Sequence, residues 1–228
     1  MKNAADWVKR EYGNLSRFDW IYLWSMLALQ ILVFIYCPES PLSIISGIAG
    51  VISVVLCARG KFSFYFIGFV QTISYLILAW NARFYGEVIE NLWYFVTMIW
   101  GIFVWKDHLV TDEKGGQQIE ALRFTPLMWA LSIAGTIVAT IAMGFVLDKV
   151  GSAQAYTDAA TNVMAIFAQI LMVKRYREQW LWWFVIDVFC IKLWFVAGNP
   201  CMVAMYIAWT VNCFYGWINW SSEVRRSA

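Results

Sequence analysis

Eight apolar segments constrain the fold of this chain more than any other feature of its sequence. As an α-helix, about 20 residues span the roughly 30 Å of hydrocarbon in a bilayer, and each segment is near that length. The segments are also too long for barrel strands and show no polar/apolar alternation. The sequence therefore predicts an all-α integral membrane protein with eight transmembrane helices, at Asp19–Tyr36, Pro41–Cys57, Phe62–Trp80, Val88–Trp105, Pro126–Leu147, Asp158–Val173, Leu181–Val196 and Cys201–Asn219.

Composition agrees with a membrane protein and excludes several function classes. Hydrophobic residues make up 61% of the chain and charged residues 14%, far from the values of a soluble domain. The single histidine, His108, lies in a loop, and the sequence offers no metal-ligand cluster and no nucleophile–base pair. We therefore expect neither an enzyme nor a bound metal or cofactor. The first apolar segment exceeds a signal-peptide core and has no cleavage site after it, so we expect it in the mature protein.

Basic residues predict the orientation in the membrane. If both termini face the cytoplasm, fourteen of the 17 lysines and arginines fall in cytoplasmic segments, and only Arg83 and Lys149 lie outside. Lys192 is left within the membrane. The net charge of +2 then reflects topology and gives no reason to expect nucleic acid. The fourteen are Lys2, Lys9, Arg10, Arg17, Arg59, Lys61, Lys106, Lys114, Arg123, Lys174, Arg175, Arg177, Arg225 and Arg226.

The five cysteines show neither CxxC spacing nor an even number. We expect them to behave as small apolar side chains. A bond between Cys37 and Cys201 at the outer rim is the alternative.

The helices are separated by short turns, except at Lys106–Thr125, which we expect to be a flexible cytoplasmic linker. On each side of it, an apolar helix ends in basic residues, an aromatic helix follows, an outer loop passes Asn81 or Asn199, and a third helix closes the half. This order predicts an internal repeat, two parallel three-helix bundles joined by a linker helix (3+1+3), with one extra N-terminal helix. Superposition of the two halves without a gap through the middle helix sets Gln71 opposite Asp187. Alignment of the third helices by their ends sets Trp100 opposite Asn212 and Trp105 opposite Trp217.

The repeat divides the chain into five predicted parts. They are an N-terminal tail and peripheral helix at 1–38, a first bundle at 39–106, a linker and connecting helix at 107–156, a second bundle at 157–220, and a cytoplasmic tail at 221–228. We expect the helix of the first part not to line the site.

Candidate site residues lie on polar and aromatic stripes within the helices. In the segment from Trp180, spacing at 100° per residue places Trp180, Trp183, Phe184, Asp187 and Trp194 on one face. Polar groups at membrane depth point inward, where they bond neighbouring helices or line a path. The substrate-binding candidates are Gln71, Asn91, Tyr94, Gln169, Trp180, Trp182, Trp183, Asp187, Asn212 and Tyr215, with Asn162 and Lys192 as structural or gating candidates.

Each candidate also has a structural explanation. Tryptophans gather at membrane interfaces, and amides bond helices together as often as they bind cargo. Asp187 can instead pair with Lys192, although a spacing of five puts the two about 140° apart around a helix. Lys192 is also near enough to a helix end to reach the interface.

Several motifs resemble the PnuC family of bacterial nicotinamide riboside transporters, from about Ser40 to Asn219. The resemblance is carried by Asn81-Ala82-Arg83-Phe84-Tyr85-Gly86, by Trp100-Gly101-Ile102-Phe103-Val104-Trp105-Lys106 and by the stretch from Gln179 to Val188, in which the family's W-x-x-W pattern falls on Trp180 and Trp183. It implies a duplicated three-helix bundle related to the SWEET sugar transporters. It also implies facilitated uptake of nicotinamide riboside through the bacterial cytoplasmic membrane.

The residues themselves suit that cargo. Aromatic faces beside one carboxylate fit a flat cationic ring, to which a cation–π contact contributes about 0.5–2 kcal/mol. Amides and hydroxyls fit a ribose and a carboxamide. No arginine pair or glycine-rich loop is present to hold a phosphate, which counts against a nucleotide. The alternatives are a related transporter of thiamine or of a sugar. The expected partners are the riboside and the lipid bilayer, with a homo-oligomer as a further possibility.

Overall fold

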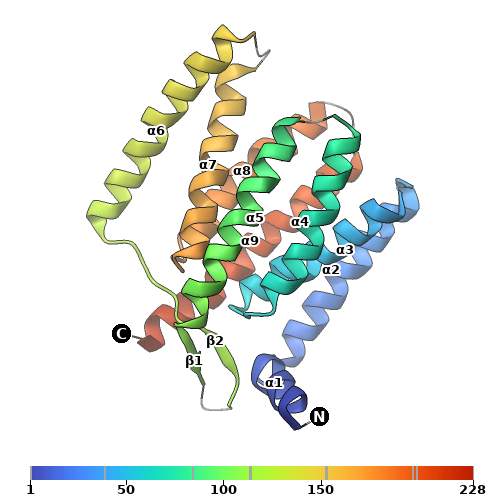
Figure 1. The fold of residues 1–228 in the computed structure, drawn as a ribbon, viewed down its shortest axis with the longest axis vertical. Helices are drawn as coiled ribbons and strands as arrows, with labels where there is room; N and C mark the ends of the chain where they lie inside the picture. The colour runs from blue at the N-terminus through green and yellow to red at the C-terminus, as the bar shows by residue number, and fades with distance from the viewer. Residues whose placement is uncertain are drawn as a thin grey trace.

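The structure is a computed structural model that describes residues 2–38, 40–83, 85–112, 115–151, 154–196, 198 and 200–227; the side chains of 2–4, 85, 86, 194, 201 and 225–227 lie outside the description. Within these ranges the chain forms nine α-helices and one β-hairpin (Figure 1). They are α1 (Lys2–Tyr12), α2 (Arg17–Tyr36), α3 (Pro41–Ala58), α4 (Phe64–Asn81), α5 (Tyr85–Lys106), β1 (Leu109–Thr111), β2 (Gln117–Ile119), α6 (Pro126–Lys149), α7 (Ala155–Val173), α8 (Gln179–Val196) and α9 (Pro200–Ser227).

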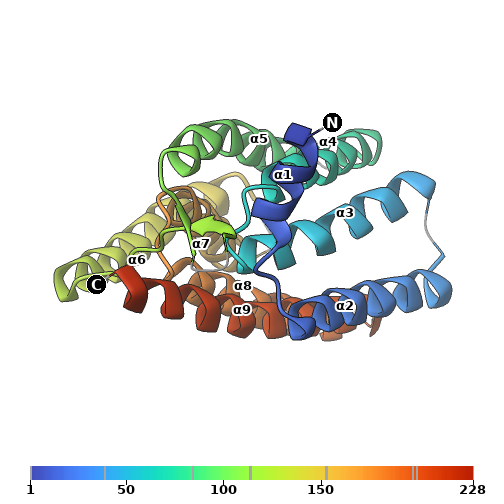
Figure 2. The ribbon, with the colours of Figure 1, turned by 90° about the horizontal axis from the view of Figure 1, so that it is seen from below.

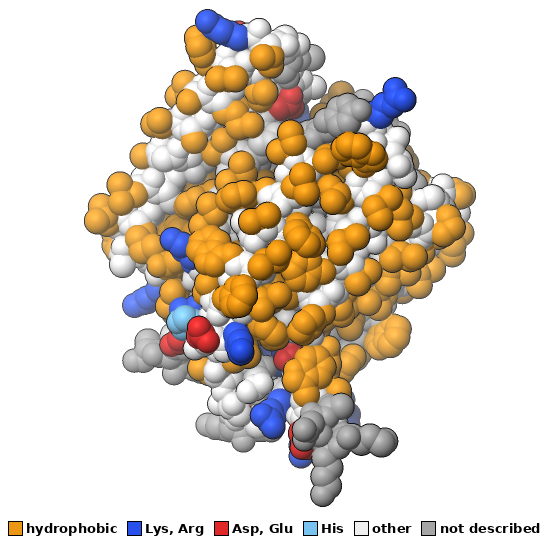
Figure 3. All heavy atoms as spheres, in the orientation of Figure 1, with side chains coloured by type: hydrophobic (Ala, Val, Ile, Leu, Met, Phe, Trp, Pro, Cys, Tyr) orange, Lys and Arg blue, Asp and Glu red, His pale blue; other side chains and the backbone are white. Residues whose placement is uncertain are grey.

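Helices α2 to α9 coincide with the eight predicted segments. Most extend one to three residues beyond them, whereas α4 begins two residues later than predicted and α9 continues eight residues further. In the described part of the chain, six helices are long and apolar enough to cross a membrane: α2, α3, α4, residues 87–106 of α5, α6 and α7. Apolar side chains also cover the face shown in Figure 3, and most of the charges on it lie at the two ends. Exposed side chains such as Phe103 and Ile218 suit contact with lipid.

The helices pack as two bundles of three. Helix α4 packs on α3 and α5, and α8 packs on α7 and α9. The bundles meet along two lines of contact, which we call the α3/α9 seam and the α5/α7 seam. Helix α6 stands beside α7, whereas α2 lies along α3 and α9 (Figures 1 and 2). Both termini and β1–β2 lie at one end of the bundles, hereafter the hairpin end (Figure 1).

The turns after α3 and α7 have matching geometry at the hairpin end. Gly60 and Arg175 both adopt a positive φ, 62° and 65°. In each turn this residue donates its N–H to the carbonyl three residues earlier, at 2.9 Å to Cys57 and 3.0 Å to Met172. The left-handed backbone is easy for glycine and uncommon for arginine.

The segment after α5 is ordered, so the prediction of a flexible linker is wrong for its described residues. Strand β1 pairs antiparallel with β2, with Leu109 opposite Ile119. Ile119 is 1% exposed, packs in the core, and donates its N–H to Gly60 O at 2.9 Å. Burial of apolar side chains therefore fixes this segment onto the turn after α3.

One cysteine differs from the expectation of small apolar side chains. Cys37 is disulfide-bonded, whereas Cys57, Cys190 and Cys213 are free. The side chain of Cys201, its expected alternative partner, lies outside the described residues.

Candidate functional site

Side chains from both bundles meet at mid-length in a group that we call the central cluster. It consists of Tyr94, Thr97, Gln169, Trp183, Asp187 and Cys213, which come from α5, α7, α8 and α9. Gln169 donates from Nε2 to Thr97 Oγ1 at 3.1 Å across the α5/α7 seam. The rings of Tyr94 and Trp183 lie 6.4 Å apart between centroids. The cluster thus joins four of the predicted binding residues.

Asp187 is the buried acid of the central cluster, with 4% of its surface exposed. The Cys213 thiol donates to its Oδ2 at 3.4 Å. Lys192 is exposed, and none of the ion pairs among the described residues includes Asp187. A thiol is a weak donor, so the carboxylate keeps acceptor capacity that a cationic or hydroxylated ligand can satisfy.

Two further acids lie on the same face of α5, toward the end opposite the hairpin. Tyr94 donates its hydroxyl to Glu90 Oε1 at 2.5 Å, and Tyr75 donates to Glu87 Oε2 at 3.2 Å. Neither acid was predicted as a site residue. The signal was present, because Glu87, Glu90 and Tyr94 recur at a spacing of three and four within a helix. Predicting the span to begin at Val88 had placed Glu87 outside it.

Asn91 is buried on this face but bonds within its own helix, since its Nδ2 donates to Glu87 O at 2.8 Å. It lies one turn from Tyr94 and therefore borders the central cluster.

Trp180, Trp182 and Trp183, three of the four tryptophans of α8, point in different directions. Trp183 contacts the central cluster, whereas Trp180 packs at the hairpin end, with its ring 6.0 Å from that of Trp220. Trp182 packs edge-on against Phe167 at 5.2 Å. The side chain of Trp194, predicted on the same stripe, lies outside the described residues.

Gln71 contacts the neighbouring helix α3, whereas Asn162 bonds within its own helix. Gln71 lies against α3, where a Cβ on Gly50 would be 3.3 Å from its Cγ. Asn162 is half-buried and donates to Asp158 O in its own helix at 2.8 Å.

Asn212 and Tyr215 face the leading helix. Tyr22 of α2 donates to Asn212 Oδ1 at 3.4 Å, and Tyr215 donates to Asp19 Oδ1 at 2.5 Å. Helix α2, which was expected not to line the site, thus contacts two of the predicted site residues. The physical reason is that α2 lies along α9, whose polar stripe it covers.

The central cluster lines neither of two cavities in the described part of the structure. One of about 10 Å³ lies between α2, α3 and α9, beside Gln30 and Asn212. The other, about 440 Å³, opens near Gly198 and Pro200 at the end opposite the hairpin. Four side chains of the central cluster are buried and so closed off from solvent in this conformation: Thr97, Gln169, Asp187 and Cys213.

Comparison with known proteins assigns the chain to a family. A family model described as nicotinamide mononucleotide transporter matches residues 40–222. The nicotinamide riboside transporter PnuC of Haemophilus influenzae is 35% identical over 96% of this chain and 97% of its own length. PnuC of Neisseria mucosa is 33% identical over 96% of this chain and 87% of its own length.

The fold matches a solved structure as well. The crystal structure of the vitamin B3 transporter PnuC superimposes with a TM-score of 0.85 at 31% identity, covering 98% of this chain and 99% of that one. These matches confirm the prediction of a PnuC-like transporter. Because the family model covers most of its length, the chain belongs to the nicotinamide mononucleotide transporter family.

Proposed function

We propose that this protein takes up nicotinamide riboside across the bacterial cytoplasmic membrane by facilitated diffusion. The similar proteins of Haemophilus influenzae and Neisseria mucosa carry that substrate in their names, whereas the family model names the mononucleotide. The two cargoes differ by one phosphate, so the charge of the site distinguishes them. Thiamine and a sugar are the remaining alternatives.

The central cluster carries the proposal, because it presents aromatic rings and a buried acid without a basic partner. The rings of Tyr94 and Trp183 suit a flat pyridinium cation, and Asp187 supplies the opposite charge. A phosphate would need arginine, lysine or a helix N-terminus to offset its charge. In the described part of the chain, none of the hydrogen bonds or ion pairs of the cluster involves a basic side chain. This favours the riboside over the mononucleotide.

We further infer that α2 to α9 all cross the membrane, with both termini in the cytoplasm, in a 3+1+3 arrangement preceded by α2. A shift of 115 positions relates equivalent contacts of the two bundles and supports the repeat. A Cβ on Gly101 would lie 2.1 Å from the Tyr65 hydroxyl, and one on Gly216 would lie 2.4 Å from the Trp180 ring. Both pairs, Tyr65 with Trp180 and Gly101 with Gly216, keep the 115-residue shift.

Transport follows from rocking of the two bundles about the central cluster. The cluster lies between them and is closed in this conformation, so cargo reaches it only when a seam parts. Opening alternately at the two ends gives alternating access without ATP. The five predicted parts of the chain fit this scheme, with 39–106 and 157–220 as the moving bundles. Homo-oligomerisation stays a prediction.

The test is uptake of labelled nicotinamide riboside into proteoliposomes without ATP or an ion gradient. We expect uptake to stop at equal concentrations inside and outside, and unlabelled riboside to compete better than the mononucleotide, thiamine or glucose. Asp187→Asn should reduce uptake about ten- to a hundredfold, in line with loss of a charge contact of about 1.5–3 kcal/mol. Lys174→Gln, which removes an exposed charge at the hairpin end, is the control and should leave uptake unchanged. Accumulation of thiamine, or of the mononucleotide, in place of the riboside would overturn the proposal.

A further inference from the structure

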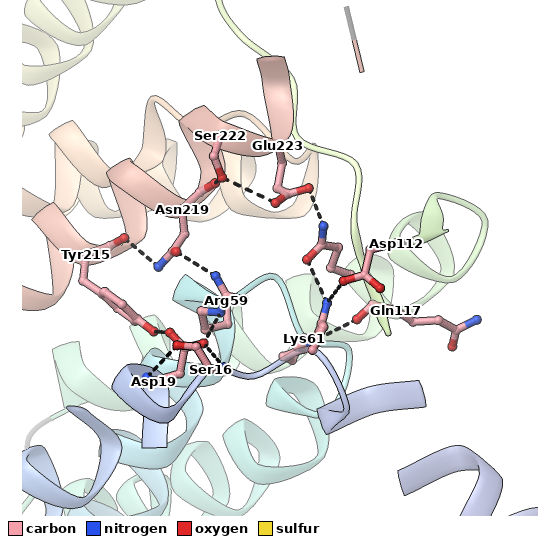
Figure 4. Close-up of polar contacts among 12 residues, drawn as sticks. Ser16, Asp19, Arg59, Lys61, Asp112, Gln117, Tyr215, Asn219, Ser222 and Glu223 are labelled. Carbon is pink, nitrogen blue, oxygen red and sulfur yellow. Dashed lines mark hydrogen bonds and ion pairs between the residues drawn. The ribbon is translucent and has the colours of Figure 1, made fainter. Parts of the chain in front are cut away.

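Asp19, in the first turn of α2, ties this helix to both sides of the α3/α9 seam (Figure 4). Its carboxylate lies 3.3 Å from Arg59 Nε, at the end of α3, and accepts the Tyr215 hydroxyl of α9 at 2.5 Å. It also accepts the Ser16 N–H at 2.7 Å, which caps α2. Asp19 is 6% exposed. One buried carboxylate thus holds three elements.

Arg59 closes this arrangement from the other side. Its Nη1 donates to Asn219 Oδ1 of α9 at 2.7 Å (Figure 4). Its Nε makes the ion pair with Asp19 but no aligned hydrogen bond. The end of α3 is therefore bonded to α9 directly through Asn219 and indirectly through Asp19.

A second set of contacts extends the arrangement to the hairpin. Lys61, fully buried in the turn after α3, donates to Asn14 Oδ1 and, at 2.7 Å, to Gln117 O. Gln118 in turn donates to Glu223 of α9. The connection between α1 and α2, the hairpin and the end of α9 are thereby joined over the same seam (Figure 4).

Among the described residues, no hydrogen bond or ion pair of the α5/α7 seam with α2 corresponds to those of Asp19. The 115-residue shift matches Arg59 to Lys174, whose side chain is exposed. The ion pair at that side, Arg175 with Glu120 at 3.3 Å, fixes the segment before α6 to the turn after α7. Helix α2 packs on α3 and α9. The two seams thus have equivalent positions in the repeat, but α2 covers only the α3/α9 seam in the described part of the chain.

We propose that α1 and α2 form a strap that holds the α3/α9 seam closed at the hairpin end, fastened by Asp19 to Arg59 and Tyr215. The inference rests on the proposed function, because a seam has to part for cargo to leave at this end. Release then requires both contacts of Asp19 to break. The leading helix is in this way part of the gate and not only a peripheral addition.

Cys57 provides a reporter that needs no cargo. It is a free thiol in the last turn of α3, 7% exposed and two residues before Arg59. Its reaction with a maleimide requires the seam to open, so the labelling rate follows the open population. The rate is measured on the purified full chain in detergent, by mass spectrometry of the peptide that contains Cys57.

Asp19→Asn should label about tenfold faster at Cys57 than the wild type, because it removes the charge that holds Arg59. Tyr215→Phe keeps the ring and removes only the hydrogen bond to Asp19, so it should show a smaller increase in the labelling rate. Glu120→Gln breaks the ion pair at the other seam and should match the wild type. Cys190 of α8, a free and partly buried thiol, acts as an internal reference whose rate should stay unchanged.

Equal labelling of Cys57 in the wild type, Asp19→Asn and Tyr215→Phe would overturn the strap, as would an equal increase at Cys57 and Cys190, which indicates general loosening. These outcomes are separate from those of the uptake assay. Absence of riboside uptake by the wild type would refute the proposed function while the labelling still reports whether α2 closes the seam.

Discussion

Trp105 and Trp220 donate their indole N–H groups across the two seams in opposite directions. Trp105 of α5 bonds Met172 O of α7 at 3.1 Å, and Trp220 of α9 bonds Cys57 O of α3 at 3.0 Å. Both donors and both acceptors are 115 positions apart. The two indoles are at most 1% exposed, and their rings lie 5.7 Å apart. The same kind of hydrogen bond, from an indole to a backbone carbonyl, therefore closes both seams at the hairpin end.

Replacing either indole by phenylalanine should destabilise the fold. Trp105→Phe and Trp220→Phe each remove a buried hydrogen bond and leave a small cavity. Together these two effects should lower the unfolding free energy of each variant by about 1–3 kcal/mol. Because Trp105 and Trp220 occupy equivalent positions in the two bundles, we expect similar losses of unfolding free energy. Denaturant unfolding in detergent measures them, with Trp24→Phe as control because Trp24 is 65% exposed. Losses no larger than that of Trp24→Phe would show that the indole bonds contribute nothing.

Two glycines permit the close approach of aromatic side chains to the third helix of each bundle. Gly216→Ala would place a Cβ 2.4 Å from the Trp180 ring, and Gly101→Ala would place one 2.1 Å from the Tyr65 hydroxyl. We expect both variants to melt at a lower temperature, because large buried rings cannot shift freely in a packed core.

Gly135→Ala, in α6, is the matched control. Nothing lies within 4 Å of its added Cβ, and alanine is the better helix former by about 1 kcal/mol. Its melting temperature should equal or exceed that of the wild type. A similar change in all three variants would mean that helix propensity, and not the close contact, decides the outcome.

The helices were predictable because length and hydrophobicity depend only on the local sequence, and α2 to α9 follow the eight apolar segments. The hairpin was not, since three-residue strands such as Gln117–Ile119 carry too little alternation to be recognised. The repeat was predicted, but its alignment was wrong. Aligning third helices by their expected ends paired Trp105 with Trp217, whereas α9 continues to Ser227 and the crossed bonds pair Trp105 with Trp220.

Helical spacing also brought out part of the candidate site, because Trp183 and Asp187 share a face of α8 whatever surrounds it. Which helix faces a stripe depends on tertiary packing. The polar stripe of α9, with Asn212 and Tyr215, meets α2, and no local pattern predicts that neighbour. The 115-residue shift likewise sets Thr72, and not Gln71, opposite Asp187.

Tyr94 combines a ring that contacts Trp183 with a hydroxyl that bonds Glu90, and the two roles can be separated. If the ring binds the cargo, Tyr94→Leu should raise the half-saturation concentration for riboside uptake roughly tenfold, within the range of a lost cation–π contact. Tyr94→Phe keeps the ring and should change it less than about threefold. Equal effects of the two substitutions would assign the role to the hydroxyl and Glu90 instead.

The buried Lys61 predicts a pH dependence of stability. Desolvation, the largest effect on this side chain, lowers its pKa from 10.5 to about 8, even though Glu11 nearby favours the charged form. Below pH 8 the side chain carries its proton in both the folded and unfolded states, so its contribution is constant. Between pH 8 and 10.5 the unfolded chain binds the proton more strongly, so deprotonation favours the folded state and stability rises with pH.

Lys61→Gln removes this titration while keeping a donor for Gln117 O. The measurement is the difference in unfolding free energy between the wild type and Lys61→Gln, taken across this pH range so that groups titrating alike in both proteins cancel. The difference should be flat below pH 8 and should shift in favour of the wild type from pH 8 to 10.5. Parallel curves throughout would mean that the Lys61 pKa is the same in both states, and a shift in favour of Lys61→Gln would mean that folding raises it. The rising difference is expected because the same burial that holds Lys61 against the hairpin removes its charge from water.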